Sequence, residues 1–264
     1  MRAHIWLLFG LLSFLSVSAH AELSPALNRF QMAIGGYAGK TDTTFRAILR
    51  TPNGRIEREA NLENNGHIHA HQNVVRYQMA GVVGDHQGWA LDYYSLLQNR
   101  EGAGPTFFLP IKGRNVEVAP ASHLRLQIDL GTATYLYWMG NGRNVFGVGG
   151  GAAYYHINLK IQGIQSVTYA KAKFAPSISV AYIHAFDDGW KFYVHAQGIA
   201  KNTGESQGHI YHGVIGISRS LGRHWTAGLE YGVAHLNIQQ TLGPYTGAID
   251  LNVHGPGIYM GMRW

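Results

Sequence analysis

The sequence contains no cysteine among its 264 residues. This absence excludes disulfide bonds, thiol catalysis and the cysteine through which a lipoprotein is lipidated. Charged residues are also scarce, at 14% of the chain. Beyond residue 21, no apolar stretch approaches the roughly 20 residues that a membrane-spanning helix needs. The sequence therefore excludes a disulfide-stapled fold and a helical membrane protein.

What the sequence has instead is 34 glycines and 15 tyrosines, a composition that favours many strands and turns. Its first 21 residues differ from the rest. Arg2 is their only charged side chain, an apolar run covers residues 5–17, and Ala19 and Ala21 match the small-residue pattern of a cleavage site. We expect a signal peptide over residues 1–21, although an uncleaved anchor is the alternative. Residues 22–264 would then form one domain with a net charge of about +5, from 20 Lys and Arg against 15 Asp and Glu.

Alternation with a period of two predicts long strands, most clearly in "LRLQIDLGTATYLYW" at residues 124–138. Its even positions are mostly apolar and its odd positions are polar, small or tyrosine, so we expect the even positions to face lipid. Four tight hairpins follow from turn signals at residues 85–87, 141–142, 187–189 and 222–224. A tryptophan lies beside each turn, which predicts an aromatic girdle at a membrane interface. The predicted girdle comprises Trp89, Trp138, Trp190, Trp225 and Trp264.

The connections between these hairpins are longer and more polar than the turns. Short turns at one end and long loops at the other predict a transmembrane antiparallel up-and-down β-barrel in a bacterial outer membrane, with its turns in the periplasm. We expect ten strands, with twelve or eight as alternatives. The count depends on residues 43–63, which we interpret as a charged ribbon above the membrane. As two further strands they would place Arg58 against lipid, at a cost of about 2–4 kcal/mol.

The chain ends in "GIYMGMRW" (residues 257–264), in which apolar residues alternate up to Trp264. This ending resembles the C-terminal signature of bacterial outer-membrane barrels, and the whole pattern is similar to small barrels of the OmpA/OmpW type. The resemblance implies that the assembly machinery recognises this strand and that it closes the barrel against the first. Because Ile249, Leu251 and Val253 have the opposite parity, we expect a bulge at residues 255–257.

Charged and histidine side chains on the other strand faces are predicted to line the lumen. Their mixed signs favour a largely plugged or narrow lumen, because opposite charges can pair there. A ten-stranded barrel also encloses little space. The predicted lumen residues are Arg76, Asp92, Arg125, Asp129, His156, Lys191, His195 and Glu230.

His67, His69 and His71 share one face of an extended segment. Adjacent members would lie about 6.6–7 Å apart, so two could share a zinc or copper ion. A polar strand end is the alternative, and no other cofactor is predicted.

Enzyme-like motifs carry little weight. Residues 204–208 match G-x-S-x-G without the strand–turn–helix context of a nucleophile elbow. Asp250 and His254 would lie about 13 Å apart on one strand. We therefore expect a non-enzymatic surface or structural protein, with a narrow channel for small solutes as the alternative and a rim hydrolase of lipid A or peptides as a weaker one.

The expected partners are outer-membrane lipid and lipopolysaccharide, the barrel-assembly machinery and an extracellular ligand, but no nucleic acid. Basic side chains in the exposed regions would contact lipid phosphates. They are Lys40, Arg50, Arg55, Lys112, Arg114, Lys171 and Lys173.

Overall fold

The computed structural model describes most of the chain from Leu23 onwards. The described residues are 23–52, 54–61, 63, 71–100, 107–111, 114–118, 122–140, 142–162, 166–201, 206–242 and 245–264. Within these ranges every regular element is a strand, and none is a helix of the length and apolarity needed to cross a membrane. The expected signal peptide lies outside them.

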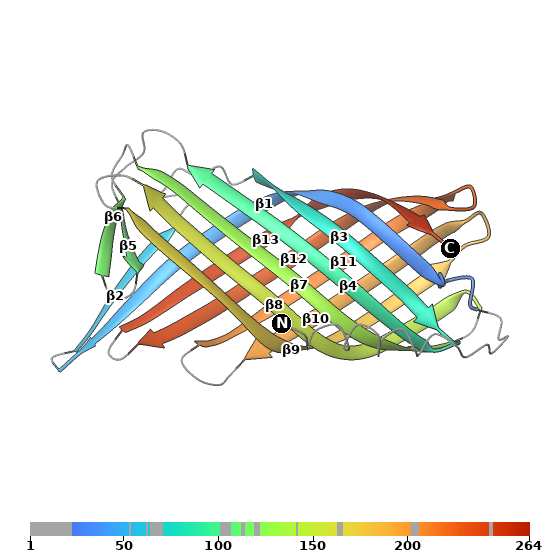
Figure 1. The fold of residues 1–264 in the computed structure, drawn as a ribbon, viewed down its shortest axis with the longest axis horizontal. Coiled ribbons are helices and arrows are strands. Elements are labelled where there is room, and N and C mark those ends of the chain that lie inside the picture. The colour runs from blue at the N-terminus through green and yellow to red at the C-terminus, as the bar shows by residue number, and fades with distance from the viewer. Residues whose placement is uncertain are drawn as a thin grey trace, which may run out of the picture.

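Ten antiparallel strands close into a barrel (Figure 1), as the sequence predicts. Each is hydrogen-bonded to its neighbours in sequence order, and the last pairs with the first. The barrel strands are β1 (Phe30–Thr51), β3 (His71–Val83), β4 (Gln87–Arg100), β7 (His123–Met139), β8 (Asn144–Gln162), β9 (Val167–Ala185), β10 (Trp190–Lys201), β11 (Ser206–Leu221), β12 (Trp225–Leu242) and β13 (Tyr245–Arg263).

Three further strands lie outside this ring. β2 (Gly54–Asn61) pairs with the distal half of β1, from Thr51↔Gly54 to Thr44↔Asn61, and forms the expected charged ribbon. It projects at the end of the barrel opposite the C-terminus (Figure 1). β5 (Phe107–Ile111) and β6 (Arg114–Val118) make a separate hairpin at the same end. The two extra membrane strands of the twelve-stranded alternative are therefore not formed.

The seam is the long β1–β13 pairing, which runs from Gln31↔Arg263 to Leu49↔Tyr245 without a change of register. At its periplasmic end the amide of Trp264 donates to the carbonyl of Phe30 at 2.9 Å, and the two rings lie 5.3 Å apart between centroids. The terminal tryptophan thus closes the barrel against the first strand.

Glycines with positive φ form the turns at this end, including Gly84 at 65° and Gly189 at 76°. The predicted registers of β9–β10 and β11–β12 are confirmed, for example Val180↔Ala196. The β3–β4 and β7–β8 pairings are each shifted by two residues from the prediction. Their turns are placed differently along the chain, and a shift of two keeps every side chain on its face.

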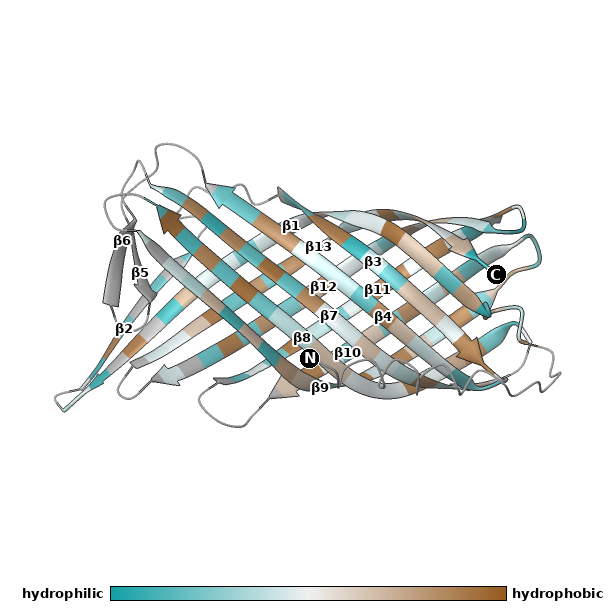
Figure 2. Cartoon of the chain, viewed as in Figure 1, coloured by the Kyte–Doolittle hydropathy of each residue, from teal (hydrophilic) through white to brown (hydrophobic). Residues whose placement is uncertain are grey.

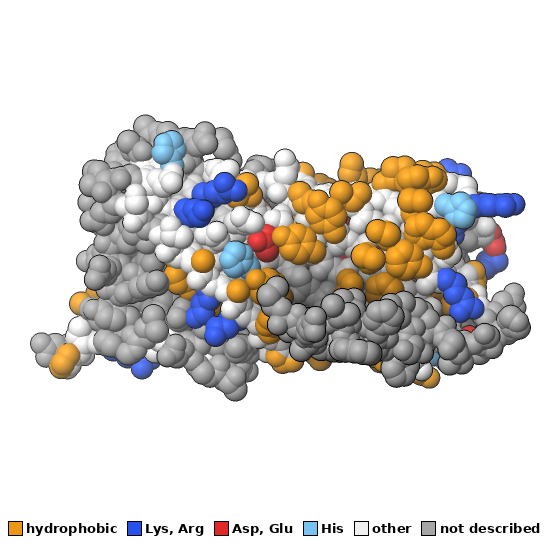
Figure 3. Space-filling view, in the orientation of Figure 1, with side chains coloured by type: hydrophobic (Ala, Val, Ile, Leu, Met, Phe, Trp, Pro, Cys, Tyr) orange, Lys and Arg blue, Asp and Glu red, His pale blue; other side chains and the backbone are white. Residues whose placement is uncertain are grey.

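The strands are too long for the membrane alone. β13 has 19 residues, whereas a spanning strand needs about 9–11. In the periplasmic half the outward side chains are apolar, for example Ile34, Leu229 and Ile258 at 55%, 62% and 66% exposure. We call these outward residues the apolar band. Hydrophobic side chains accordingly gather over the half of the visible surface nearest the C-terminus (Figure 3).

In the extracellular half the polarity of the two faces is exchanged. Interior residues there form a hydrophobic cluster that includes Leu124, Leu126 and Ile161, each at most 1% exposed. Outward residues such as Lys40, Asp42 and Asn252 are polar and exposed. The extracellular half therefore has the apolar interior and polar exterior of a water-soluble barrel. Hydrophobic and hydrophilic residues alternate along the strands in both halves (Figure 2).

This exchange corrects the prediction for β7 and β8. Leu124, Leu126 and Leu136 face inward, not toward lipid, whereas Tyr135 and Tyr137 are about half exposed on the outer wall. Pairing across strands fixes this choice: Asp92 is buried inside the barrel and lies opposite Thr132, so the even positions of β7 must also point inward.

The same exchange removes the expected bulge in β13. Leu251 points inward at 4% exposure and Ile258 points outward at 66%, yet the register with β1 and β12 is continuous between them. The apolar residues change parity because the strand passes from the extracellular half into the membrane.

Four of the five girdle tryptophans lie on the outer wall beside the periplasmic turns. Trp225 and Trp264 are 46% and 52% exposed, and Trp89 packs against Phe30. The guanidinium of Arg219 lies over the ring of Trp190, 5.3 Å from its centroid. Trp138 is the exception. It points into the barrel at 7% exposure, because it shares the inward face of β7 with Leu136.

Candidate functional sites in the lumen and on the extracellular wall

Ionised side chains from opposite walls meet in the lumen around Arg76 of β3. Its guanidinium donates to Glu230 of β12 at 2.9 and 2.8 Å, and to Asp92 of β4 at 3.0 and 3.3 Å. It also donates to the hydroxyl of Tyr37 at 3.2 Å, and Tyr193 of β10 donates to Glu230 at 2.7 Å. We call these five residues the arginine cluster. Since β3 and β4 lie across the ring from β10 and β12, the cluster bridges the lumen.

Burial makes this pairing essential to the barrel. The side chains of Arg76, Asp92 and Glu230 are 7%, 5% and 1% exposed, and an unpaired charge at such a depth costs several kcal/mol. Ring contacts extend the cluster. Tyr94 lies 5.4 Å from the Arg76 guanidinium and 4.7 Å from the ring of His212, which lies 6.5 Å from His195.

Below the cluster, residues 23–28 fold back into the periplasmic mouth. Ala26 and Leu27 are buried against Trp138, Leu136 and other apolar residues of the interior. The ammonium of Lys191 holds this segment by donating to the Ala26 carbonyl at 2.9 Å and to Asn28 Oδ1 at 3.1 Å. This N-terminal segment therefore forms a floor beneath the lumen.

Above the cluster lies an apolar cavity of about 90 Å³, lined by side chains such as Val74, Leu96, Ile210 and Leu251. Still higher, Gln98 is fully buried and donates to Thr41 at 2.9 Å and to Glu63 at 3.2 Å. The described interior therefore alternates between apolar and polar layers from one end to the other.

The structure brings together five of the eight predicted lumen residues. Arg76, Asp92, Lys191, His195 and Glu230 face inward. Tyr37, Tyr94 and Tyr193 were missed as site residues, although all three lie on the inward parity of their strands. That parity was the signal that could have identified them.

Arg125, Asp129 and His156 lie on the outer wall, which corrects their predicted place in the lumen. Asp129 accepts hydrogen bonds from Ser95 at 2.7 Å, Tyr93 at 3.0 Å and Gln127 at 3.0 Å, and His156 lies 3.4 Å away. The error follows from the inverted faces of β7 and β8. In the extracellular half, the polar face is the outer one.

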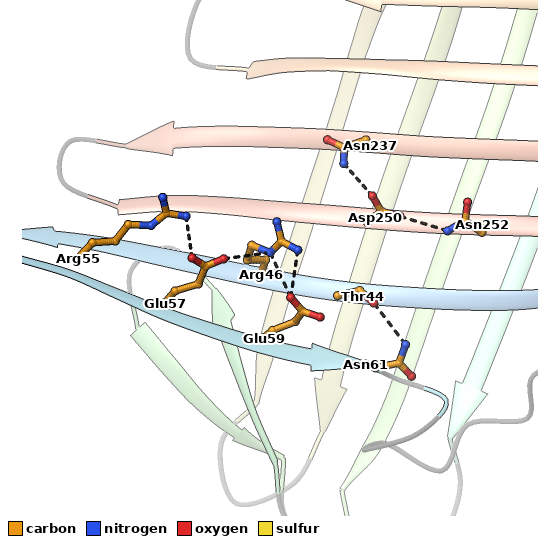
Figure 4. A network of polar contacts seen from close by, with 9 residues as sticks. All are labelled: Thr44, Arg46, Arg55, Glu57, Glu59, Asn61, Asn237, Asp250 and Asn252. Carbon is orange, nitrogen blue, oxygen red and sulfur yellow. Dashed lines mark hydrogen bonds and ion pairs between the residues drawn. The ribbon is translucent and has the colours of Figure 1, made fainter.

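The extracellular wall carries a second polar network (Figure 4). Arg46 of β1 pairs with Glu57 at 3.3 Å and with Glu59 at 3.1 Å on β2, and Arg55 pairs with Glu57 at 2.7 Å. All of these side chains are about half exposed, so the pairs order the ribbon at a small gain in free energy.

Asp250 and His254 occupy separate environments on the outer face of β13. Asp250 accepts from Asn237 at 2.8 Å and from Asn252 at 3.3 Å, whereas His254 bonds the hydroxyl of Tyr231 at 2.8 Å. This arrangement does not form an acid–base dyad. The expected metal site at His67 and His69 lies outside the described residues, as does the side chain of His71. Among the described side chains, no group of three potential ligands could hold a metal ion.

No protein-family model matches the sequence, and no characterised protein matches it at the level of sequence. Among solved structures, the outer membrane protease OmpT from Escherichia coli matches with a TM-score of 0.56 at 8% identity, over 94% of this chain and 100% of that chain. The translocator domain of the autotransporter NalP from Neisseria meningitidis matches at 0.42 and 11% identity, over 98% and 94%. The outer membrane protein OprG from Pseudomonas aeruginosa matches at 0.40 and 9%, over 91% and 99%. At these identities the likeness to OmpT shows the fold alone, that of a Gram-negative outer-membrane β-barrel.

Proposed function

We propose that this protein is a non-enzymatic outer-membrane barrel whose lumen is closed to solutes and whose activity resides on its extracellular wall. The observation that carries the proposal is the arginine cluster, which joins β3 and β4 to β10 and β12 across the lumen. The floor formed by residues 23–28 supports it from the periplasmic side. Mixed charges that satisfy one another are typical of a plug, whereas an ion pore lines its path with one sign.

Recording from planar bilayers tests this closure directly. The purified barrel should insert without producing conductance steps at any voltage or pH, while a porin added to the same membrane produces them. Regular ion steps from the wild-type protein would instead establish the narrow-channel alternative. In parallel, vesicles that carry the barrel should cleave lipid A and peptides no faster than empty vesicles.

Two basic side chains on the outer wall support lipopolysaccharide as the partner. Arg125 of β7 and Lys160 of β8 lie directly opposite each other, and both are exposed. Like charges in that arrangement repel, and no carboxylate within the described ranges forms an ion pair with either. They lie on the extracellular side of the apolar band, where a lipid phosphate would relieve the repulsion.

Removing both charges should weaken this contact. We expect the double variant Arg125→Ala, Lys160→Ala to retain several-fold less lipopolysaccharide after purification, because each cation contributes about 1 kcal/mol near a charged lipid surface. Arg143→Ala is the matched control, since Arg143 lies at the periplasmic end and pairs with Asp187. If the wild type, the double variant and Arg143→Ala all retained the same amount of lipopolysaccharide, Arg125 and Lys160 would be excluded as the lipopolysaccharide contact.

A further inference from the structure

A second cavity, of about 150 Å³, lies in the periplasmic half of the lumen. We call it the lower cavity. It is bounded below by Ala26 and Leu27 of the N-terminal segment and above by Asp92 and Tyr193 of the arginine cluster. One water molecule needs about 10–15 Å³ of such space, so the lower cavity has room for a small polyatomic ligand together with water.

Two cations line this cavity. They are Lys191 of β10 and Arg263 of β13, and the positive charge of Arg263 repels the Lys191 ammonium. The Asp92 carboxylate, which also lines the cavity, is already bound by two nitrogens of Arg76. In the part of the chain that the structure describes, neither Lys191 nor Arg263 forms an ion pair. The arginine cluster has one cation and two carboxylates, so it offsets one of the two positive charges that face the lower cavity. The other positive charge has no carboxylate to neutralise it, which is costly at low dielectric.

The donors of both cations are incompletely used. An ammonium group has three N–H donors, and Lys191 spends two of them on Ala26 and Asn28. Arg263 donates through one terminal nitrogen to the Gly222 carbonyl at 3.2 Å, but its buried Nε has no hydrogen-bond partner among the described residues. A buried N–H without a partner costs about 1–3 kcal/mol, so an acceptor in the cavity would stabilise this geometry.

We propose that the lower cavity binds a small oxyanion, held between Lys191 and Arg263. An oxyanion supplies the missing negative charge and accepts from both the ammonium and the Nε–H, and charge-assisted bonds of this kind are the strong ones. Ser220 lines the same cavity, and its hydroxyl can offer a further donor. The floor of residues 23–28 excludes a bulky lipid headgroup, so the ligand is a free anion such as phosphate, sulfate or a small carboxylate.

Arginine Nε–H signals in NMR spectra of the complete, 15N-labelled barrel test the proposal with inorganic phosphate. Phosphate should shift the Arg263 signal saturably against a chloride titration of matched ionic strength. The Arg76 signal should stay in place, because its Nε is held by Asp92 at 3.3 Å. An Arg263 signal that does not move, or that moves equally with chloride, overturns the proposal.

Variants of the second cation separate a specific site from general attraction. Lys191→Gln should weaken phosphate binding about tenfold or more, since it removes a charge-assisted bond. Lys191→Arg, which retains charge and donors, should keep most of the affinity. Arg143→Gln should leave it unchanged, because Arg143 is exposed and pairs with Asp187. Folding of each variant is verified by the change in its electrophoretic mobility on heating, which folded outer-membrane barrels show. Equal affinity in the wild type and in folded Lys191→Gln would contradict the proposed site.

Discussion

At the scale of single residues, the barrel depends most on Arg76. Replacement by alanine would leave Asp92 and Glu230 buried without their shared cation, at 5% and 1% side-chain exposure. We expect Arg76→Ala to lower the free energy of unfolding by about 3–5 kcal/mol. Equilibrium unfolding in guanidinium, with the protein refolded into lipid vesicles, measures this loss.

Arg125→Ala is the matched control. Its side chain is exposed on the outer wall, without an ion pair among the described residues, so the change should cost at most about 0.5 kcal/mol. A large loss for Arg125→Ala, or none for Arg76→Ala, would mean that the two side chains have been assigned to the wrong faces.

Residue patterns alone could not have distinguished these two arginines. Both lie on the polar face of an alternating strand, and alternation says that two faces differ without saying which one points inward. The decisive information is the position along the strand, because polar residues face the lumen in the membrane and face water above it. Arg76 was placed correctly because its polar neighbours lie within the membrane half.

At the scale of elements, β13 records this change of environment along one continuous strand. Asn252, His254, Ile258 and Met260 all point outward and are all exposed, the first two in water and the last two in lipid. Sequence analysis predicted the strand and its pairing with β1, but explained the parity of Leu251 by a bulge. A bulge and a change of solvent leave the same pattern in the sequence, and only the unchanged register with both neighbouring strands distinguishes them.

An arginine placed on the outer face of β13 should therefore reduce stability by very different amounts at two positions. Ile258→Arg would bury a charge in hydrocarbon and should destabilise the barrel by about 2–4 kcal/mol. His254→Arg, four residues away on the same face, should change stability by less than about 1 kcal/mol, because charge is tolerated near the interface. Unfolding in guanidinium compares the two, and equal costs would contradict a membrane boundary between these positions.

At the scale of the whole molecule, the barrel is a closed cylinder with an apolar outer surface in its periplasmic half and a polar outer surface in its extracellular half. Ten strands, their order, the ribbon of β1 and β2 and four of the five girdle tryptophans were predictable, because turn chemistry and alternation are local signals. The contents of the lumen were predictable only in part. Contacts such as Arg76–Glu230 join residues 154 positions apart, and no local pattern specifies which strands lie across the ring from each other.

The apolar face of each strand changes sides where the strand leaves the membrane. Since the chain has no cysteine, single cysteines at Asn252 and Ile258 can carry spin labels without other changes to the protein. In lipid vesicles, EPR should show that oxygen dissolved in lipid speeds the relaxation of the spin label at position 258. A water-soluble nickel complex should speed the relaxation of the label at position 252. Lipid-type accessibility at both positions would contradict the claim.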